Sequence, residues 1–276
     1  MIQVVEQLVQ GKSPNRLCED IITVTPHFCA VIDGSTSKGT RSYGGKSTGR
    51  LAAEQIDNVI KDFPAEISLC EAVRLLTESI RIFYQKNKLE EDVRRHPENR
   101  LTASVAIYSD YLKEIWLIGD CQCRFAGQTY TNSKETDKVL AEIRSDINRF
   151  LLTHGHTTQE LAQEDLGRKF IWDALKDQCV FQNVSFEICP YGYTVIDGFA
   201  AIKKGIKVLS VREEAEVILA SDGYTQLADN MNDTEICLQK TLEENPLLIE
   251  PEKSTKGLMA GARSFDDRSY LRFKIT

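Results

Sequence analysis

Two carboxylates in this sequence stand where short apolar runs end before a glycine. Asp33 follows residues 28–32 (FCAVI), and Asp222 follows residues 217–221 (VILAS) in the same way. An apolar, β-branched run bounded by an Asp-Gly pair predicts a buried strand that ends in a tight turn. The carboxylate then lies at the edge of a sheet. Such an aspartate is often only a turn residue, because its side chain can bond the backbone two positions further on, so the repeat matters more than either position.

Other acidic residues also lie at predicted strand ends, and the full set is Glu19-Asp20, Asp33, Asp120, Asp222 and Asp266-Asp267. The strands predicted at 21–25 and 28–32 are joined so briefly that they must be antiparallel. The acids that begin one strand therefore lie beside the acid that ends its partner. Converging carboxylates are costly unless a cation neutralises them, and hard ions such as Mg²⁺ or Mn²⁺ take several oxygen ligands. Two such ions could hold a hydroxide for attack on phosphorus.

These acids need a scaffold that brings the strand ends together. Periodicity predicts strands at 2–9, 21–25, 28–32, 101–108, 114–118, 123–126, 193–196, 206–210, 217–220 and 268–275. It predicts helices at 45–60, 69–84, 136–152, 158–175 and 234–242, with a charged connection at 86–100 and a meander between 101 and 126. Strands early, middle and late, with helix pairs between them, indicate an α+β fold of antiparallel sheets layered with helices, in one domain over 1–276.

Two further patterns resemble functional motifs but have simpler explanations. Asp197-Gly198 repeats the Asp-Gly pattern, but strand-like residues follow at once and no acidic residue is adjacent, so we expect a hairpin turn. Residues 44–48 (GGKST) look like a phosphate-binding loop, which would indicate nucleotide binding. The required glycine spacing is absent and the preceding strand ends too far back. A plain helix N-terminus is the better interpretation of this segment.

Composition argues against several other classes. The chain has 276 residues, 42% of them hydrophobic and 27% charged, with a formal net charge of −7 and a sequence pI near 5.3. No basic stripe stands out, which argues against a nucleic-acid partner. The sequence holds no apolar run long enough for a membrane span and no signal-peptide pattern. Eight scattered cysteines without a Cys-x-x-Cys pair indicate reduced thiols, and we expect a cytoplasmic monomer without a membrane partner.

In order along the chain, the acidic motifs resemble those of the metal-dependent type 2C serine/threonine protein phosphatases, as in a divergent bacterial-type member. The matching segments are Arg16 with Glu19-Asp20, residues 31–34 (VIDG), 101–104 (LTAS) with 118–121 (IGDC), 219–223 (LASDG) and 264–267 (SFDD). The resemblance covers nearly the whole chain. It implies a four-layer αββα sandwich, in which two antiparallel sheets are flanked by helix pairs. Residues 131–191 match no motif, and we expect them to hold variable, substrate-side elements.

The resemblance also implies a set of metal ligands. In that family the aspartate matching Asp33 bridges two Mn²⁺ or Mg²⁺ ions, and the carbonyl of Gly34 is a further ligand. Glu19, within the pair that also supplies Asp20, supports the second ion. The acids that complete the first ion are Asp222 and Asp266, while Asp120 together with Asp222 can hold a third ion.

Arg16 matches the family's basic residue that binds the substrate phosphate. A bidentate guanidinium suits that role, although a surface arginine in a turn is the alternative. Two departures stand out: Ser35 and Thr36 follow Gly34 where many members carry a histidine thought to be a general acid, and Cys121 replaces a serine. Neither change removes a metal ligand.

We therefore expect an active phosphomonoester hydrolase in which a hydroxide bridges two Mn²⁺ or Mg²⁺ ions. Its expected substrate is phosphoserine or phosphothreonine in a protein. Two alternatives remain open: a phosphorylated small molecule as the substrate, or a catalytically degraded module with the same fold that serves as a sensor or scaffold.

Overall fold

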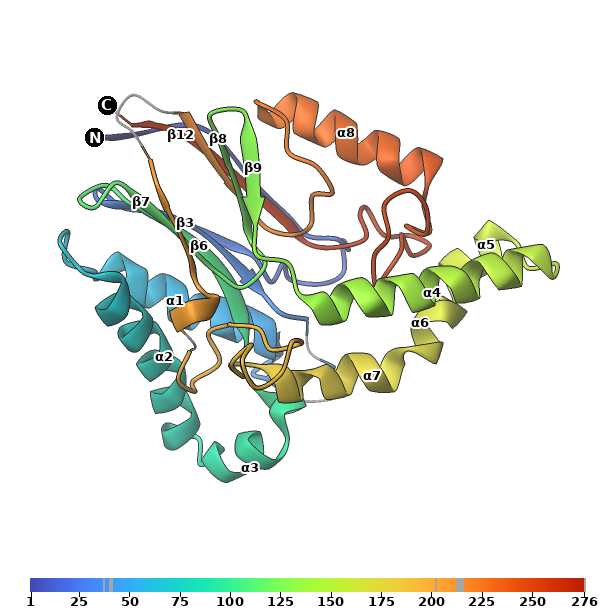
Figure 1. Cartoon of the computed structure of the whole chain (residues 1–276), viewed down its shortest axis with the longest axis horizontal. Coiled ribbons are helices and arrows are strands. Elements are labelled where there is room, and N and C mark those ends of the chain that lie inside the picture. Colours follow the sequence, from blue (N-terminus) through green and yellow to red (C-terminus); the bar gives the residue numbers. More distant parts are fainter. Residues whose placement is uncertain (37, 40–41, 202, 212–215, 276) are drawn as a thin grey trace.

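Two antiparallel sheets of five strands each form the centre of the protein (Figure 1). The computed structural model describes residues 1–36, 38–39, 42–201, 203–211 and 216–275. The first sheet has the order β10 (Lys207–Ser210), β7 (Glu114–Ile118), β6 (Ala103–Ser109), β3 (Phe28–Gly34) and β2 (Ile21–Val24). The second has the order β1 (Ile2–Gln10), β12 (Arg268–Ile275), β11 (Glu216–Ala220), β8 (Gln122–Phe125) and β9 (Gln128–Thr131). A small hairpin pairs β4 (Ser42–Tyr43) with β5 (Lys46–Ser47).

The strand that carries Asp33 is buried on both faces. On one face, Val31 of β3 packs in a cluster with Leu219 of β11 and Phe273 of β12, so this cluster joins the two sheets. On the other face, Ile32 packs with Ile56 of α1 (Thr48–Lys61) and with residues of α2 (Leu69–Lys86). A strand covered on both faces reads as a continuous apolar run, which explains the uninterrupted sequence before Asp33.

Helix α8 (Met231–Glu244) covers the outer face of the second sheet (Figure 1). Its Leu238 packs with Ile218 of β11 and Tyr270 of β12. The layers are therefore helices, sheet, sheet and helix, and the predicted α+β sandwich of two antiparallel sheets is confirmed. No helix in the described part of the chain has both the length and the apolar character to cross a lipid bilayer.

Most predicted elements are confirmed within a few residues, but the predicted meander is wrong. β6 and β7 pair in the first sheet, whereas β8 pairs with β11 and β9 in the second. The chain changes sheets at Gly119, whose φ of +88° is favourable only for glycine. A Cβ at this position would also lie 2.2 Å from the hydroxyl oxygen of Ser104. This crossing places Asp120 between the ends of the two sheets.

The middle of the chain contains more helices than predicted, and most of them are short. The connection at 86–100 contains α3 (Glu90–Arg95) and a 3₁₀ turn (Pro97–Asn99), and the single helix predicted at 158–175 is three short helices. The helices of this section are α4 (Glu135–Thr153), α5 (Thr158–Gln163), α6 (Leu166–Phe170) and α7 (Trp172–Asp177). Asp165 separates α5 from α6 because its side chain caps α6, accepting from the backbone N–H of Arg168 at 2.9 Å.

Residues 193–196 form isolated bridges and not a strand, so the hairpin predicted around Asp197 is also wrong. Asp197 is instead a fully buried carboxylate that forms an ion pair with Arg100 at 3.0 Å. It also accepts a hydrogen bond from the side-chain amide of Asn183 at 2.9 Å. Its role is structural, and it does not line the cavity described below.

Helix α4 is confirmed, but it presents its polar face to the protein. Arg144 and Asn148 are fully buried, whereas Val139, Ile143 and Phe150 are 43%, 39% and 58% exposed. The apolar positions that predict the helix are thus among its exposed residues.

The buried guanidinium of Arg144 explains this orientation. Its Nε and Nη2 donate to Oδ2 of Asp165 at 2.8 and 2.6 Å. The same guanidinium donates to the carbonyls of Leu247, Leu248 and Ser254 at 2.9, 3.3 and 2.9 Å. A buried charge needs such complete pairing. Arg144 therefore fixes α4, α6 and the loop after α8 to one another.

We predict that Asp165→Ala lowers the free energy of unfolding by about 3 kcal/mol, because it leaves a buried guanidinium without its counter-ion. Urea denaturation followed by circular dichroism measures the effect. Asp146→Ala is the matched control, because it removes the exposed partner of Arg149 on the same helix and should hardly move the denaturation midpoint. Equal midpoints for the two variants would contradict this account of α4.

Candidate functional site

A cavity of about 280 Å³ opens where strand ends of the two sheets meet the first turns of α4. Its lining includes four of the predicted acids, which are Asp33, Asp120, Asp222 and Asp266. They come from the end of β3, the crossing after β7, the turn after β11 and the segment before β12. The structure therefore brings together residues that lie up to 233 positions apart in the sequence (266 − 33).

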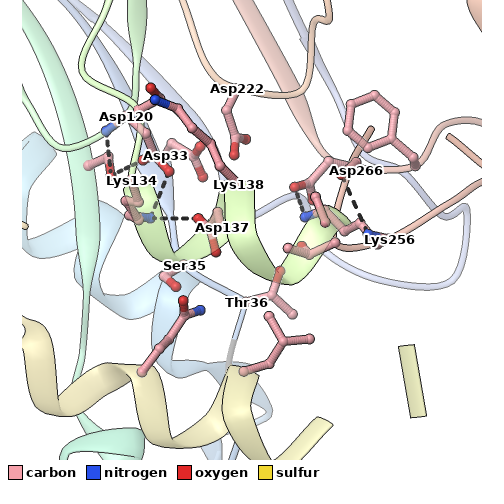
Figure 2. A pocket seen from close by; sticks show the side chains of 18 of the residues that line it. Asp33, Ser35, Thr36, Asp120, Lys134, Asp137, Lys138, Asp222, Lys256 and Asp266 are labelled. Carbon is pink, nitrogen blue, oxygen red and sulfur yellow. Dashed lines mark hydrogen bonds and ion pairs between the residues drawn. The ribbon is translucent and has the colours of Figure 1, made fainter. Parts of the chain in front are cut away.

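Asp33 and Asp222 differ from the other acids because they lack a basic partner. Figure 2 shows their carboxyl groups side by side in the cavity, where the two side chains hydrogen-bond to each other. Among the described residues, no Lys or Arg forms an ion pair with either group. The surrounding protein, and after it the charge of Asp222, raises the pKa of Asp33 well above its usual value.

Asp120 is neutralised by Lys134, the residue just before the first turn of α4. The Nζ of Lys134 lies 2.6 Å from Oδ2 of Asp120, and the hydroxyl of Ser104 donates to Oδ1 at 2.5 Å (Figure 2). Although burial alone would raise it, the pKa of Asp120 is lowered by Lys134 and by these hydrogen bonds. Asp120 is thus satisfied by the protein itself.

Asp266 is held by two lysines. The Nζ of Lys12 donates to Oδ1 at 2.9 Å, and the Nζ of Lys256 donates to Oδ2. Burial, and then the charge of Lys12, lower the pKa of Lys256 to about 8. The backbone N–H of Asp267 completes the bonding of Oδ1 at 2.9 Å.

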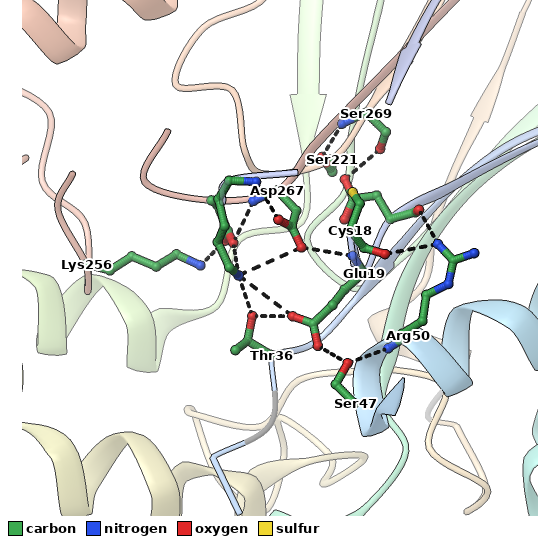
Figure 3. Close-up of polar contacts among 12 residues, drawn as sticks. Cys18, Glu19, Thr36, Ser47, Arg50, Ser221, Lys256, Asp267 and Ser269 are labelled. Atoms are coloured by element: carbon green, nitrogen blue, oxygen red, sulfur yellow. Dashed lines mark hydrogen bonds and ion pairs between the residues drawn. The ribbon is translucent and has the colours of Figure 1, made fainter. Parts of the chain in front are cut away.

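Glu19 and Asp20 are not part of the cavity lining. Figure 3 shows Glu19 beside Thr36, Ser47 and Asp267. Glu19 accepts hydrogen bonds from the hydroxyls of Ser47 at 2.5 Å and Thr36 at 2.7 Å. Oδ2 of Asp20 accepts from Ser269 at 2.8 Å, while Oδ1 is buried without a partner. Burial raises the pKa of Asp20 to about 7. An orphaned carboxylate oxygen at this depth is unusual, and a cation would satisfy it.

Asp267 has a structural role that the sequence did not predict. Its two oxygens accept from the backbone N–H groups of Lys12 at 2.7 Å and Glu19 at 2.9 Å, so it holds the loop between β1 and β2 in place. Among the described residues, Cys18, Asp20 and Asp267 also form a group whose potential ligand atoms all lie within 4.8 Å of one another. The backbone bonds of Asp267 account for its place in that group.

Gly34 stands where only glycine fits. A Cβ there would lie 2.3 Å from the carbonyl oxygen of Gly49 in the first turn of α1, and 2.7 Å from the carbonyl oxygen of Glu19. Close packing of two backbones is sufficient to explain this glycine, and the metal role of its carbonyl stays a prediction.

Arg16 differs from the other predicted site residues because it is exposed and neither lines the cavity nor contacts the acids. In the same loop, Lys12 turns inward and reaches Asp266, so the inward cation comes four residues earlier than predicted. The structure thus removes the geometric basis for the predicted contact between Arg16 and phosphate.

Sequence reasoning also missed the basic residues of the cavity. Lys38, Lys134, Lys138, Arg168, Lys253 and Lys256 all line it. They come from four segments far apart in the chain and share no spacing. Their inward positions depend on how α4, α6 and the loop after α8 pack, which no local pattern encodes.

No family model matches this sequence, and no curated protein sequence matches it either. Solved structures do match the fold over the full chain. In fold, the chain is similar to bacterial serine/threonine phosphatases. At these levels of identity the likeness leaves the activity to be argued from the side chains.

Three of these solved structures illustrate the likeness. The catalytic domain of the phosphatase PstP with two manganese ions has 12% identity and a TM-score of 0.49, with 100% of both chains covered. RsbX in complex with magnesium has 10% identity and a TM-score of 0.45, again with 100% of both chains covered. Stp1 from Staphylococcus aureus has 13% identity and a TM-score of 0.46, covering 100% of this chain and 96% of its own.

The donor set of the cavity fits a divalent cation. Asp33 and Asp222 offer adjacent carboxyl oxygens in the cavity, and Asp20, whose Oδ1 is buried without a partner, is close enough to act on the pKa of Asp33. Hard cations prefer this all-oxygen chemistry. Asp120 and Asp266, by contrast, would first have to release their lysines.

We predict that Mn²⁺ binds to the protein after treatment with EDTA, and that Asp33→Asn or Asp222→Asn weakens binding by at least about tenfold. Isothermal titration calorimetry gives the affinity, and a rise in the thermal midpoint reports binding independently of activity. Asp137→Asn is the control, because Asp137 lines the same cavity outside the predicted ligand set. An unchanged affinity in Asp33→Asn would refute the assignment.

We also predict that Lys256→Met tightens Mn²⁺ binding, by roughly threefold to tenfold, because it frees one oxygen of Asp266 and removes a nearby positive charge. The same titration measures the change. Lys253→Met is the matched variant: Lys253 lines the cavity but is paired with Glu142 at 2.5 Å, and its loss should leave the affinity nearly unchanged. Weaker binding in Lys256→Met would show that this lysine supports the ion site.

Proposed function

We propose that this chain is a metal-dependent phosphomonoester hydrolase that removes phosphate from phosphoserine or phosphothreonine in proteins. The observation that carries the proposal is the pair Asp33 and Asp222, two adjacent carboxyl groups in one cavity with no ion pair to a lysine or arginine among the described residues. Two such groups side by side are unfavourable unless a cation joins them, and the rest of the cavity offers cations suited to an anionic substrate.

The chain's own residues divide into three tasks in this proposal. Asp33 and Asp222 hold the ions, with Asp20, Glu19 and the carbonyl of Gly34 as supporting groups. When bound, Mn²⁺ or Mg²⁺ supplies Lewis-acid chemistry, activating water and neutralising phosphoryl charge. Lys256 lines the cavity beside Asp266 and takes the phosphate-contacting role that the sequence assigned to Arg16.

The leaving oxygen needs a proton from a source other than histidine. Ser35 and Thr36 both line the cavity in the position where a histidine could otherwise stand. Thr36 is already engaged, since its hydroxyl donates to Glu19 and accepts from Lys12 at 2.9 Å. Ser35 therefore serves to position water at the leaving group, and water delivers the proton.

A second candidate function, a binding module that does not turn over, is favoured by one observation. Lysine ammonium groups already neutralise Asp266 and Asp120, two of the predicted ligands. A site that supplies its own cations can stay folded without metal ions. Retention of Mn²⁺ binding without phosphate release would identify this alternative.

Turnover tests the proposal directly. We expect Mn²⁺- or Mg²⁺-dependent release of phosphate from p-nitrophenyl phosphate and from a phosphoserine peptide, and a loss of at least about 100-fold in kcat/KM for Asp33→Ala. A phosphorylated sugar in the same assay separates a protein phosphatase from a small-molecule phosphatase. Arg16→Gln, placed outside the cavity, should keep wild-type kcat/KM. Full activity of Asp33→Ala, or no activity with either metal, would overturn the proposal.

A further inference from the structure

Two half-buried cations line the wall of the cavity formed by the segment after β3, α4 and α6. Lys38 follows β3, and Arg168 lies in α6; both belong to the cavity lining. Neither forms an ion pair with any residue that the structure describes. Within the described chain, the guanidinium of Arg168 donates a hydrogen bond to the backbone carbonyl of Thr255. Its backbone N–H donates to the side chain of Asp165, which caps α6.

The positive charges on this wall repel one another. Burial, and then the charges of Lys134 and Arg168 among others, lower the pKa of Lys38. Burial lowers the pKa of Arg168, and Arg144 adds to this effect against the opposing charges of Asp165 and Asp137. Unpaired like charges in a cavity are unfavourable unless an anion from outside the chain compensates them.

The neighbouring charged residues are already engaged and do not supply that anion. Lys134 is paired with Asp120 at 2.6 Å, and Asp137 lies 3.9 Å from the same lysine. On the rim, Lys138 is paired with Glu135 at 2.5 Å. Glu142 of α4 is paired with Lys253, and Asp137 attracts Lys38 and Arg168 without forming an ion pair with either, which leaves both cations available to a ligand.

We propose that Lys38 and Arg168 form a subsite for a second anionic group on the substrate, beside the phosphate that is hydrolysed. This inference rests on the proposed phosphatase function, because the same cavity holds Asp33 and Asp222. A planar guanidinium binds phosphate or carboxylate in a bidentate manner, and a lysine adds a point charge. The favoured substrate thus carries a phosphate or a carboxylate next to its phosphoserine or phosphothreonine.

Binding of inorganic phosphate to the metal-free protein tests the subsite without any turnover. We expect Lys38→Gln and Arg168→Gln each to weaken phosphate binding by about tenfold, since each removes one charge-assisted contact. Arg168→Lys should recover part of the loss. Lys169→Gln is the matched control, because Lys169 is the next residue of α6 and pairs with Glu164 at the surface. Unchanged phosphate affinity in both glutamine variants would overturn the subsite.

Turnover with Mn²⁺ then identifies the source of the second anion. Three phosphoserine peptides differ only in the residue after the phosphoserine: asparagine, aspartate or a second phosphoserine. We expect KM to fall by about tenfold from the asparagine peptide to the better of the two anionic peptides, and the difference to vanish in Lys38→Gln. Equal KM for the three peptides would overturn the inference. Absence of hydrolysis of all three would refute the proposed function, while phosphate binding would still decide the subsite.

Discussion

The cavity depends on how its carboxylates are neutralised, because four acids meet at the edge where strand ends of both sheets come together. We call this edge the rim. Antiparallel strands end at that rim from both sheets, and each ends near an acid, so the fold itself concentrates negative charge there. The chain compensates Asp120 with Lys134 and Asp266 with Lys12 and Lys256. Within the described part of the chain, no lysine or arginine forms an ion pair with Asp33 or Asp222, although Lys256 and Lys134 act on Asp222 from further away. The acids that are paired with lysines stabilise the cavity, whereas the two acids without such a pair are the candidates for binding a metal ion.

The strands of the rim could be predicted from sequence because burial on both faces leaves a clear local signal. The apolar run of β3 and the alternation of β12 are examples, and β12 has the predicted bounds of 268–275. The acids follow directly from the strand ends. The partition of strands between sheets could not be predicted, because the change of sheet at Gly119 depends on pairing between β8 and β11, which lie about 95 residues apart.

The faces of helices were harder to predict than the helices themselves. Val139 and Ile143 gave the period of α4, yet the buried guanidinium of Arg144 determines which face turns inward. The same packing explains why basic residues line the cavity, because the start of α4 places Lys134 there and α6 places Arg168 there. The section at 131–191, which matched no motif, thus supplies much of the positive charge. The outward position of Arg16 and the inward position of Lys12 could not be predicted for a related reason, since a loop can turn any one of its residues inward.

The contact between Gly34 and Gly49 has a mechanical consequence. Backbone touches backbone at this point, with no side chain between them to yield. The end of β3, which carries Asp33, and the first turn of α1 must therefore move as one piece. A substitution that shifts the first turn of α1 is therefore expected to displace Asp33, although no residue of α1 lines the cavity. The position of Asp33 thus depends on the packing of α1 as well as on the sheet.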